Sequence, residues 1–412
     1  MKFRVLSTFV SVASFAAALG SSPLWAVPKL TDLYEFPGPG LTEVLGASPL
    51  SVGKNVIYGT TGVSIFQLKK VKVTMPGQSP WARTTLAAFG DPSGSRLFGR
   101  GGLLLSTSGK IYASLSHGSA LGNPFDLVIE LTPPAKGQTS WSTNTITSFQ
   151  DGPDGNYPLE GGLIQDSSGS IFGTAMLGGS TATKYNGCGI VYKLSPPGGG
   201  VNGWTKSIIY TFNGVSDGCQ PQGALAMDAS GAIYGATQFS TENGGTGGTL
   251  YKLSPINGGG YSFSKIWTFA LNGVDGCTPT GGVTIDPAGN LYGAAATMCQ
   301  GQKYVPIWKL SPAGSGSYAM THPWPASDPN PPQVYGAPSL NIKNGTLYGM
   351  SYYGDLFKLT PPALGKTVWK KTVLWSLPES ESIHSPVFSA GALYFGISGL
   401  PSRFGTIYKS SP

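Results

Sequence analysis

The chain has 412 residues, of which only 11% are charged, and it contains 61 glycines and 33 prolines. This composition indicates many short strands joined by tight turns, and no helical periodicity stands out. The formal net charge is +7, and it becomes 7 − 2 = +5 without Lys2 and Arg4. Because the excess is small and no dense cluster of lysine and arginine is present, we do not expect a nucleic acid as partner.

The first 26 residues have the pattern of a secretory signal peptide. Lys2 and Arg4 give a basic start, residues 5–19 are mostly apolar, and cleavage is expected after Ala26. Cleavage leaves a single domain, residues 27–412, of 412 − 26 = 386 residues. We expect this domain to be secreted or periplasmic, with no integral membrane segment. An uncleaved membrane anchor is the alternative.

The first strand-like run of the mature chain is residues 33–36, Leu-Tyr-Glu-Phe. It is followed by a recurring motif, G-G-L-x-x-D-x-x-G-x-[IL]-[YF]-G, whose clearest copies are residues 161–173, 223–235 and 281–293. Weaker copies share the aromatic position, so seven marker residues define seven repeats: Tyr58, Tyr112, Phe172, Tyr234, Tyr292, Tyr348 and Tyr394. Repeats of this length that are built from strands predict a propeller, with an open β-solenoid as the alternative.

Each repeat predicts four strands. In the third repeat these are residues 163–165, 171–174, 190–194 and 204–212, with a tight turn from Asp166 to Gly169 after the first. Proline after Ser195 is expected to stop the third strand. Fourth strands recur at residues 81–89, 141–149, 263–269 and 369–377. The fold class is therefore all-β, a seven-bladed β-propeller with four-stranded blades.

The ends of the chain predict how the ring closes. The last repeat has strand-like runs around Tyr394 and at residues 406–409, but the sequence stops before a fourth strand. Residues 33–36 resemble a fourth strand that has no repeat before it. We expect this N-terminal segment to supply the outer strand of the seventh blade, which would leave no exposed sheet edge there.

These motifs resemble the GloVer tandem repeat, a family of secreted bacterial proteins. The matching residues are 161–174, the G-x-[VL]-Y-K-L strands at 189–194 and 248–253, and the D-G-x-x-P loops at 154–158, 217–221 and 275–279. The resemblance covers almost the whole mature chain and is strongest in the three central repeats. It implies the fold and no particular reaction. Members often end in an anchoring segment, and its lack after Lys409 favours a released or periplasmic protein.

The D-G-x-x-P loops are the first candidate binding surface. Each links the outer strand of one blade to the inner strand of the next, so their copies should ring the channel mouth on one face. The candidate residues are the loop aspartates, the variable residues just before inner strands, and two irregular positions: Asp154, Asp217, Asp275, Arg100, Glu160, Gln222, Trp324 and His384. The alternative is that Asp-Gly serves turn geometry alone.

Four cysteines fall in loops of this same face: Cys188, Cys219, Cys277 and Cys299. An even count after a signal peptide favours disulfides, and we favour the pairs Cys188–Cys219 and Cys277–Cys299 among three possible pairings. No Cys-x-x-Cys is present and the three histidines are scattered. We therefore expect no metal site and no cofactor.

Three further sets of residues have simpler interpretations. The turn aspartates Asp166, Asp228 and Asp286 are expected to cap their own hairpins. The tryptophans that open fourth strands, Trp81, Trp141, Trp204 and Trp369, are assigned to packing between blades rather than to sugar stacking. The third-strand lysines are interpreted as solvated edge residues, with a basic ring for an anionic partner as the alternative: Lys193, Lys252, Lys309, Lys358 and Lys409.

The leading functional hypothesis is a monomeric, non-catalytic binding module that presents one loop-rich face to a glycan or a surface protein. A carbohydrate-active enzyme, a lyase or a glycosidase at the channel mouth, is the second hypothesis. It would pair Glu160 with one of the loop aspartates or use His384 as a base. A structural envelope protein without a small ligand is the third.

Overall fold

The computed structural model describes residues 30–36, 45, 50–53, 55–76, 78–89, 102–115, 126–150, 152–158, 162–179, 187–198, 200, 202–240, 247–270, 275–279, 281–295, 307–323, 340–350, 355–364, 366, 368–376, 382–383, 386–398 and 405–411. The signal-like segment, Arg100, Glu160, Cys299, Trp324 and His384 lie outside these residues.

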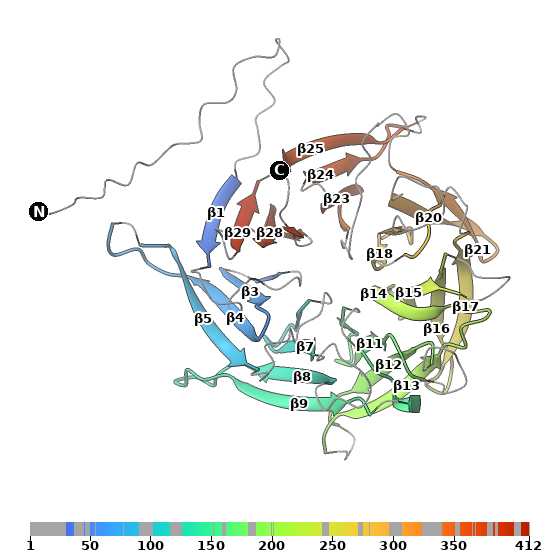
Figure 1. Cartoon of the computed structure of the whole chain (residues 1–412), viewed down its shortest axis with the longest axis horizontal. Coiled ribbons are helices and arrows are strands. Elements are labelled where there is room, and N and C mark those ends of the chain that lie inside the picture. The colour runs from blue at the N-terminus through green and yellow to red at the C-terminus, as the bar shows by residue number, and fades with distance from the viewer. Residues whose placement is uncertain are drawn as a thin grey trace, which may run out of the picture.

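Seven antiparallel sheets stand around a common centre, and each runs from an inner strand to an outer strand (Figure 1). The first three are blade 1 with β2 (Ser51–Gly53), β3 (Val56–Thr60), β4 (Ser64–Lys70) and β5 (Trp81–Ala88); blade 2 with β6 (Leu104–Leu105), β7 (Ile111–Leu115), β8 (Leu127–Thr132) and β9 (Ser142–Ser148); and blade 3 with β10 (Ile164–Gln165), β11 (Ile171–Ala175), β12 (Ile190–Ser195) and β13 (Thr205–Thr211). The 3₁₀ turn η1 (Gly152–Asp154) precedes blade 3.

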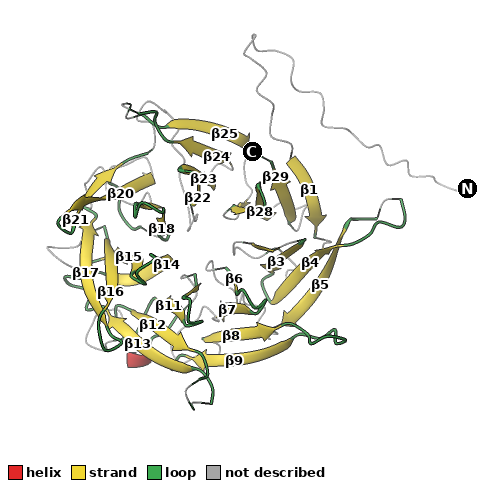
Figure 2. Cartoon of the chain, turned by 180° about the vertical axis from the view of Figure 1, so that it is seen from behind, coloured by secondary structure: helices red, strands yellow, loops and turns green. Residues whose placement is uncertain are grey.

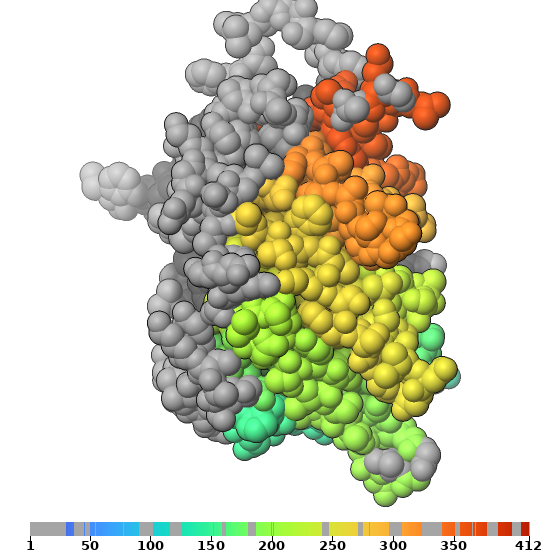
Figure 3. Space-filling model, turned by 90° about the vertical axis from the view of Figure 1, so that its right-hand side faces the viewer, coloured from blue at the N-terminus to red at the C-terminus, as the bar shows by residue number. Residues whose placement is uncertain are grey.

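The next three blades repeat this order. They are blade 4 with β14 (Cys219–Met227), β15 (Ile233–Phe239), β16 (Thr249–Pro255) and β17 (Tyr261–Thr268); blade 5 with β18 (Thr284–Ile285), β19 (Leu291–Ala294), β20 (Ile307–Gly314) and β21 (Ser317–Thr321); and blade 6 with β22 (Asn341–Lys343), β23 (Thr346–Met350), β24 (Asp355–Thr360) and β25 (Lys370–Ser376). Seen from the side, the wall of the ring passes from green through yellow and orange to red along the chain (Figure 3). The predicted seven-bladed β-propeller is confirmed.

Blade 7 closes the ring with both ends of the chain. It contains β26 (Ser382–Ile383) and β27 (Val387–Ser389), both beside β28 (Ala392–Ser398), then β29 (Thr406–Ser410) and finally β1 (Leu30–Glu35). The last two strands pair antiparallel, with Leu30 opposite Ser410 and Glu35 opposite Thr406. In Figure 2, β1 lies outside β29 at the edge of the ring. The prediction that the N-terminal segment supplies this outer strand is confirmed.

In five blades, a glycine inside the second strand makes room for an aromatic side chain on the third, whereas blade 7 pairs Phe395 with Tyr408. Gly173 on β11 pairs with Tyr192 on β12, and a Cβ on Gly173 would lie 2.6 Å from Cζ of that fully buried tyrosine. The same arrangement recurs in four other blades as Gly59–Phe66, Gly235–Tyr251, Gly293–Trp308 and Gly349–Phe357. Blade 2 pairs Ala113 with Ile129 instead. The glycine of the motif is therefore a packing requirement.

The hairpin aspartates cap their own turns, as expected. Oδ1 of Asp166 accepts hydrogen bonds from the backbone N–H groups of Ser168 and Ser170, both at 2.9 Å. Asp228 and Asp286 make the equivalent bonds. Gly169 has φ +84°, a left-handed conformation that glycine adopts without strain.

The interpretation of the third-strand lysines as edge residues is wrong. Each third strand pairs on both sides, so it is an internal strand of its sheet. Four of the ammonium groups lie over the marker ring opposite them: Lys193 over Phe172 at 5.6 Å, Lys252 over Tyr234 at 5.4 Å, Lys309 over Tyr292 at 5.8 Å and Lys409 over Tyr394 at 5.8 Å. These are cation–π contacts at half-buried positions.

Proline stops the third strand only in some blades. Strand β12 ends at Ser195 as predicted, but β20 continues through Pro312 to Gly314. The last β20 residue that pairs with β19 is Leu310, so Pro312 lies beyond the inner neighbour and pairs only with Tyr318 of β21. At Pro312 the strand has a hydrogen-bonded neighbour on one side only. The backbone N–H that proline lacks therefore costs less stability there.

The hydrophobic core lies between neighbouring blades. Tyr192 and Leu194 of blade 3 pack with Tyr112 and Val128 of blade 2, for example. Leu33 and Phe36 join blade 7 to blade 1 in the same way, in a cluster with Ile57, Phe66 and Tyr394. Within the described residues, no helix is long and apolar enough to cross a membrane.

Candidate functional site

The antiparallel order of the strands gives the ring two faces. The loops between blades and the loops joining second to third strands lie on one face, called here the interblade-loop face. The turns joining first to second and third to fourth strands lie on the other, called here the hairpin face. The D-G-x-x-P candidates belong to the interblade-loop face.

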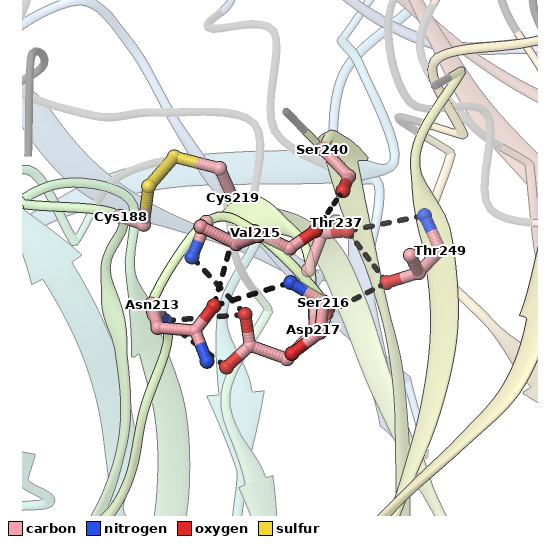
Figure 4. Close-up of a disulfide and its surroundings, with 10 residues drawn as sticks. Cys188, Asn213, Val215, Ser216, Asp217, Cys219, Thr237, Ser240 and Thr249 are labelled. Carbon is pink, nitrogen blue, oxygen red and sulfur yellow. Dashed lines mark hydrogen bonds between the residues drawn. A yellow bond between two sulfur atoms is a disulfide. The ribbon is translucent and has the colours of Figure 1, made fainter. Parts of the chain in front are cut away.

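Asp217 lies on the interblade-loop face, and its carboxylate accepts hydrogen bonds from its own loop. Its residue is only 2% exposed. The carboxylate accepts hydrogen bonds from the backbone N–H groups of Asn213 and Gly214, and from the hydroxyl of Tyr210 at 2.9 Å (Figure 4). Burial and the bond to Asp217 raise the pKa of Tyr210, so its hydroxyl stays a donor. These bonds are those of a structural turn.

The other two loop aspartates lie close to basic side chains of the blade that follows them, Lys206 on β13 and His322 just after β21. Asp154 lies 2.6 Å from Nζ of Lys206 and accepts a hydrogen bond from the backbone N–H of Gln150. Asp275 lies 3.1 Å from Nε2 of His322. The described residues contain no group of three or more histidine, cysteine, aspartate or glutamate side chains that could hold a metal ion.

The structure places one further candidate. Gln222 lies on β14 and is half-buried, where its amide contacts Sδ of Met176 and Oε1 of Gln238. Arg100, Glu160, Trp324 and His384 lie outside the described residues and stay predictions. The predicted binding ring and the enzymatic pairs built on Glu160 or His384 therefore also stay predictions.

One predicted disulfide is confirmed. Cys188 bonds Cys219, with their Cα atoms 4.4 Å apart, and Figure 4 shows the bridge beside the Asp217 loop. The bridge joins the loop before β12 to the first residue of β14, so it ties blade 3 to blade 4. Cys277 is also disulfide-bonded, and its predicted partner Cys299 lies outside the described residues.

A large cavity lies on the hairpin face, between blades 2 and 3. This 2/3 groove has a volume of about 1070 Å³. Most of its walls are polar, and they come from the hairpins of both blades and from both outer strands. The wall of the groove includes Lys110, Tyr112, Glu130, Asn144, Gln165, Asp166 and Trp204.

Glu130 is a nearly buried carboxylate in the wall of the 2/3 groove. Its Oε1 accepts hydrogen bonds from Nζ of Lys110 at 3.0 Å and from the hydroxyl of Thr132 at 3.2 Å. Its Oε2 is buried and has no hydrogen-bond partner among the described residues. Burial raises the pKa of Tyr112, and the charge of Glu130 raises it further.

The other blades show that the fold does not require Glu130. Glu130 pairs with the marker Tyr112, and the residue opposite the marker is lysine in five other blades and Gln67 in blade 1. Lys110 stands where the other blades have uncharged residues, so Glu130 and Lys110 form an ion pair that is particular to blade 2. The signal was visible in the sequence, where I-E-L at residues 129–131 replaces the Y-K-L of the central repeats.

Trp204 forms an aromatic edge of the groove. Its ring packs edge-on against Tyr112, with centroids 5.7 Å apart and planes at 75°. The residue is only half-buried, so part of the indole lines the cavity. Trp141 makes the same contact with Tyr58 one blade earlier, at 6.1 Å. The assignment of Trp204 to blade packing is correct but incomplete.

Asp166 adds an acceptor at the floor of the groove. In the two equivalent hairpins, the second carboxylate oxygen accepts a hydrogen bond from a marker tyrosine: Asp228 from Tyr234 at 2.9 Å and Asp286 from Tyr292 at 3.0 Å. The marker of blade 3 is Phe172, which has no hydroxyl. In the part of the chain that the structure describes, no protein donor is seen at Oδ2 of Asp166, which is a partly exposed residue.

Comparison with known families decides the identity of the repeat. The model of the Gloeobacter/Verrucomicrobia repeat matches residues 99–360. The chain belongs to this repeat family. The match includes blades 2 to 5, and so both walls of the 2/3 groove. Among curated proteins, none matches the chain.

Solved structures share the fold at low identity. An ulvan lyase, from a family of polysaccharide lyases, has 9% identity and a TM-score of 0.52, and covers 92% of this chain and 95% of its own. An aldose sugar dehydrogenase from Streptomyces coelicolor with bound PQQ has 14% identity, a TM-score of 0.42, and coverage of 79% and 92%. A protein of unknown function from Dyadobacter fermentans has 14% identity, a TM-score of 0.44, and coverage of 75% and 92%. At 9% identity, the likeness to the ulvan lyase concerns the fold alone.

Proposed function

We propose that this repeat protein is a non-catalytic carbohydrate-binding module, and that it binds a neutral glycan in the 2/3 groove. The observation that carries the proposal is the combination of a half-buried indole, Trp204, with a wall of hydroxyl, amide and carboxylate groups around a cavity of about 1070 Å³. Pockets for apolar ligands have mostly apolar walls. A ring of sugar carbons needs an aromatic face, and its hydroxyls need many polar partners.

The charges of the groove favour an uncharged ligand. The single lysine in its wall, Lys110, is already paired with Glu130 at 3.0 Å. The free oxygen of Asp166 and the amides of Asn144 and Gln165 can accept or donate hydrogen bonds to hydroxyls. An acidic sugar would meet two carboxylates, so its binding would be opposed.

Replacing Trp204 tests the proposal. We expect Trp204→Ala to weaken binding of the best oligosaccharide by about 30-fold, which corresponds to about 2 kcal/mol, the usual loss for a central aromatic contact. The measurement is titration calorimetry with neutral hexasaccharides of the cellulose, xylan, mannan and β-glucan series.

Trp141→Ala is the matched control, because it removes the same packing against Tyr58 and is not part of the 2/3 groove. It should leave the affinity unchanged. A third variant, Glu130→Gln, copies Gln67 of blade 1, adds no like charge beside Lys110, and should weaken binding while the protein stays folded. Equal losses from both tryptophan variants, or binding of a cell-surface protein that Trp204→Ala does not affect, would contradict the proposal.

We also propose that the protein is exported and that residues 1–26 are removed. A disulfide between Cys188 and Cys219 persists in oxidising compartments, and a signal-like segment precedes the domain. The intact mass of the protein from the periplasm or the culture medium should correspond to a chain that begins at Val27. A mass that retains residues 1–26, or a protein found only in the cytoplasm, would contradict export.

A further inference from the structure

A second groove lies on the hairpin face where the two ends of the chain meet. This 7/1 groove has a volume of about 550 Å³ and lies between blades 7 and 1. It is the structural equivalent of the 2/3 groove. Tyr394 is its marker aromatic, as Tyr112 is in the other, and Trp81 opens the next outer strand, as Trp204 does. Thr31 pairs with Lys409 as Asn144 pairs with Glu130.

The central charge is reversed between the two grooves. The residue opposite the marker is Lys409 in the 7/1 groove and Glu130 in the 2/3 groove. Lys409 lies over the ring of Tyr394 at 5.8 Å. Among the described residues, no carboxylate lies within ion-pair distance of Lys409. Its charge is therefore available to a ligand, whereas the charge of Glu130 is shared with Lys110.

A second lysine reinforces this charge. Lys70 ends β4 and pairs with Trp81, and it is exposed in the wall of the groove. In the sequence, all six other repeats have a proline at this position: Pro133, Pro196, Pro255, Pro312, Pro361 and Pro412. No carboxylate of the described chain is within ion-pair distance of Lys70. The only acid in the groove wall is Asp32, which is exposed on β1.

We propose that the 7/1 groove is a second carbohydrate site, and that it binds a sugar unit bearing a carboxylate or a sulfate. Lys70 and Lys409 contact the anionic group, and the half-buried ring of Trp81 contacts the sugar carbons. Asp32 accepts hydrogen bonds from the hydroxyls. This site is independent of the 2/3 groove, which has two carboxylates in its wall and is proposed for neutral glycans.

Binding in this groove would also stabilise the closed ring. The walls come from β1 at the N-terminus, from Lys409 on the last strand, and from blade 1. A ligand that contacts all three holds the first and last blades together, and it binds only the closed form. Ligand binding to the native state raises the free energy of unfolding by RT ln(1 + [L]/Kd). An anionic ligand should therefore raise Tm.

The test compares four probes by calorimetry and thermal unfolding. They are a galacturonate hexamer, a sulfated galactan hexamer, a neutral galactan hexamer and inorganic sulfate. At least one anionic hexamer should bind at least about tenfold more tightly than the neutral one, and its affinity should fall as salt is raised. The choice between the two anionic hexamers identifies carboxylate or sulfate as the recognised group. Inorganic sulfate that binds as tightly as either hexamer would overturn the proposal, since it would show an ion site only.

Variants that remove each positive charge locate the binding. Lys409→Gln copies Gln67 of blade 1, and Lys70→Gln keeps the backbone N–H that donates to the carbonyl of Asn55. Each should weaken the anionic hexamer at least about tenfold. Lys252→Gln makes the matched change over Tyr234 and should have no effect. Trp204→Ala should leave this binding unchanged, which separates the result from that of the 2/3 groove. Unchanged binding by Lys409→Gln would overturn the proposal.

Discussion

Replacing Gly173 by alanine should destabilise the propeller, although alanine ordinarily suits a strand better than glycine does. A new Cβ would lie 2.6 Å from Cζ of Tyr192 and 2.9 Å from Cδ2 of Leu163, and both residues are buried. Overpacking of this kind costs about 1 to 3 kcal/mol, which exceeds the gain of about 0.5 to 1 kcal/mol from removing a glycine. Guanidinium unfolding should show a lower midpoint with an unchanged slope.

The cost should disappear when the aromatic partner is made smaller. Blade 2 has Ala113 opposite Ile129 at the equivalent positions, and both are buried. The pair Gly173→Ala with Tyr192→Ile copies that solution. Tyr192→Ile alone leaves a cavity beside Gly173 and should be destabilising. The double variant should therefore be more stable than the sum of the two single effects predicts, by at least about 1 kcal/mol. If the two single effects are additive, the side chains at positions 173 and 192 are not energetically coupled.

This pair explains why the fold could be predicted so fully from the sequence. The glycine after the marker and the aromatic residue of the third strand are local patterns, and they recur together in five of the seven repeats. The strands of blade 3 follow the predicted residues to within two positions at each end, with β13 beginning at Thr205 rather than Trp204. Ring closure could be predicted because the last repeat lacks a fourth strand and the N-terminal segment resembles a fourth strand without a repeat before it. Pairing of β1 with β29 completes the seventh blade.

The candidate site was harder to predict. Whether a side chain can bind a ligand depends on which of its hydrogen-bonding atoms are already occupied by neighbouring groups. Asp217 stands in a regular motif, yet three backbone and side-chain donors occupy its carboxylate. A sequence does not show whether an acid faces its own loop or the solvent. The 2/3 groove combines Glu130 of blade 2 with Trp204 of blade 3, so its shape arises only when the blades pack. The signals of the site that the sequence offered were two departures from the repeat. Glu130 replaces the lysine of five other blades, and Phe172 replaces the tyrosine of the other markers.

The Cys188–Cys219 disulfide should contribute a large stabilisation to the junction of blades 3 and 4. The bridge closes a loop with a sequence separation of 31 residues, and loop-closure entropy predicts a loss of about 3 to 4 kcal/mol when it is absent. Alanine is the suitable replacement at both positions, since both cysteines are almost fully buried and serine would bury two hydroxyls.

Local opening should accompany the loss of stability in the Cys188→Ala/Cys219→Ala variant. The backbone N–H of Gln220 donates to the carbonyl of Cys188 at 2.9 Å, which anchors the start of β14 to the preceding blade. Without the bridge, that amide should exchange with solvent faster, while amides in the centre of β12 keep their protection. Guanidinium unfolding without reductant gives the global change. A loss below about 1 kcal/mol with unchanged exchange at Gln220 would show that packing of Phe212 and Tyr251 between the two blades suffices to hold this junction.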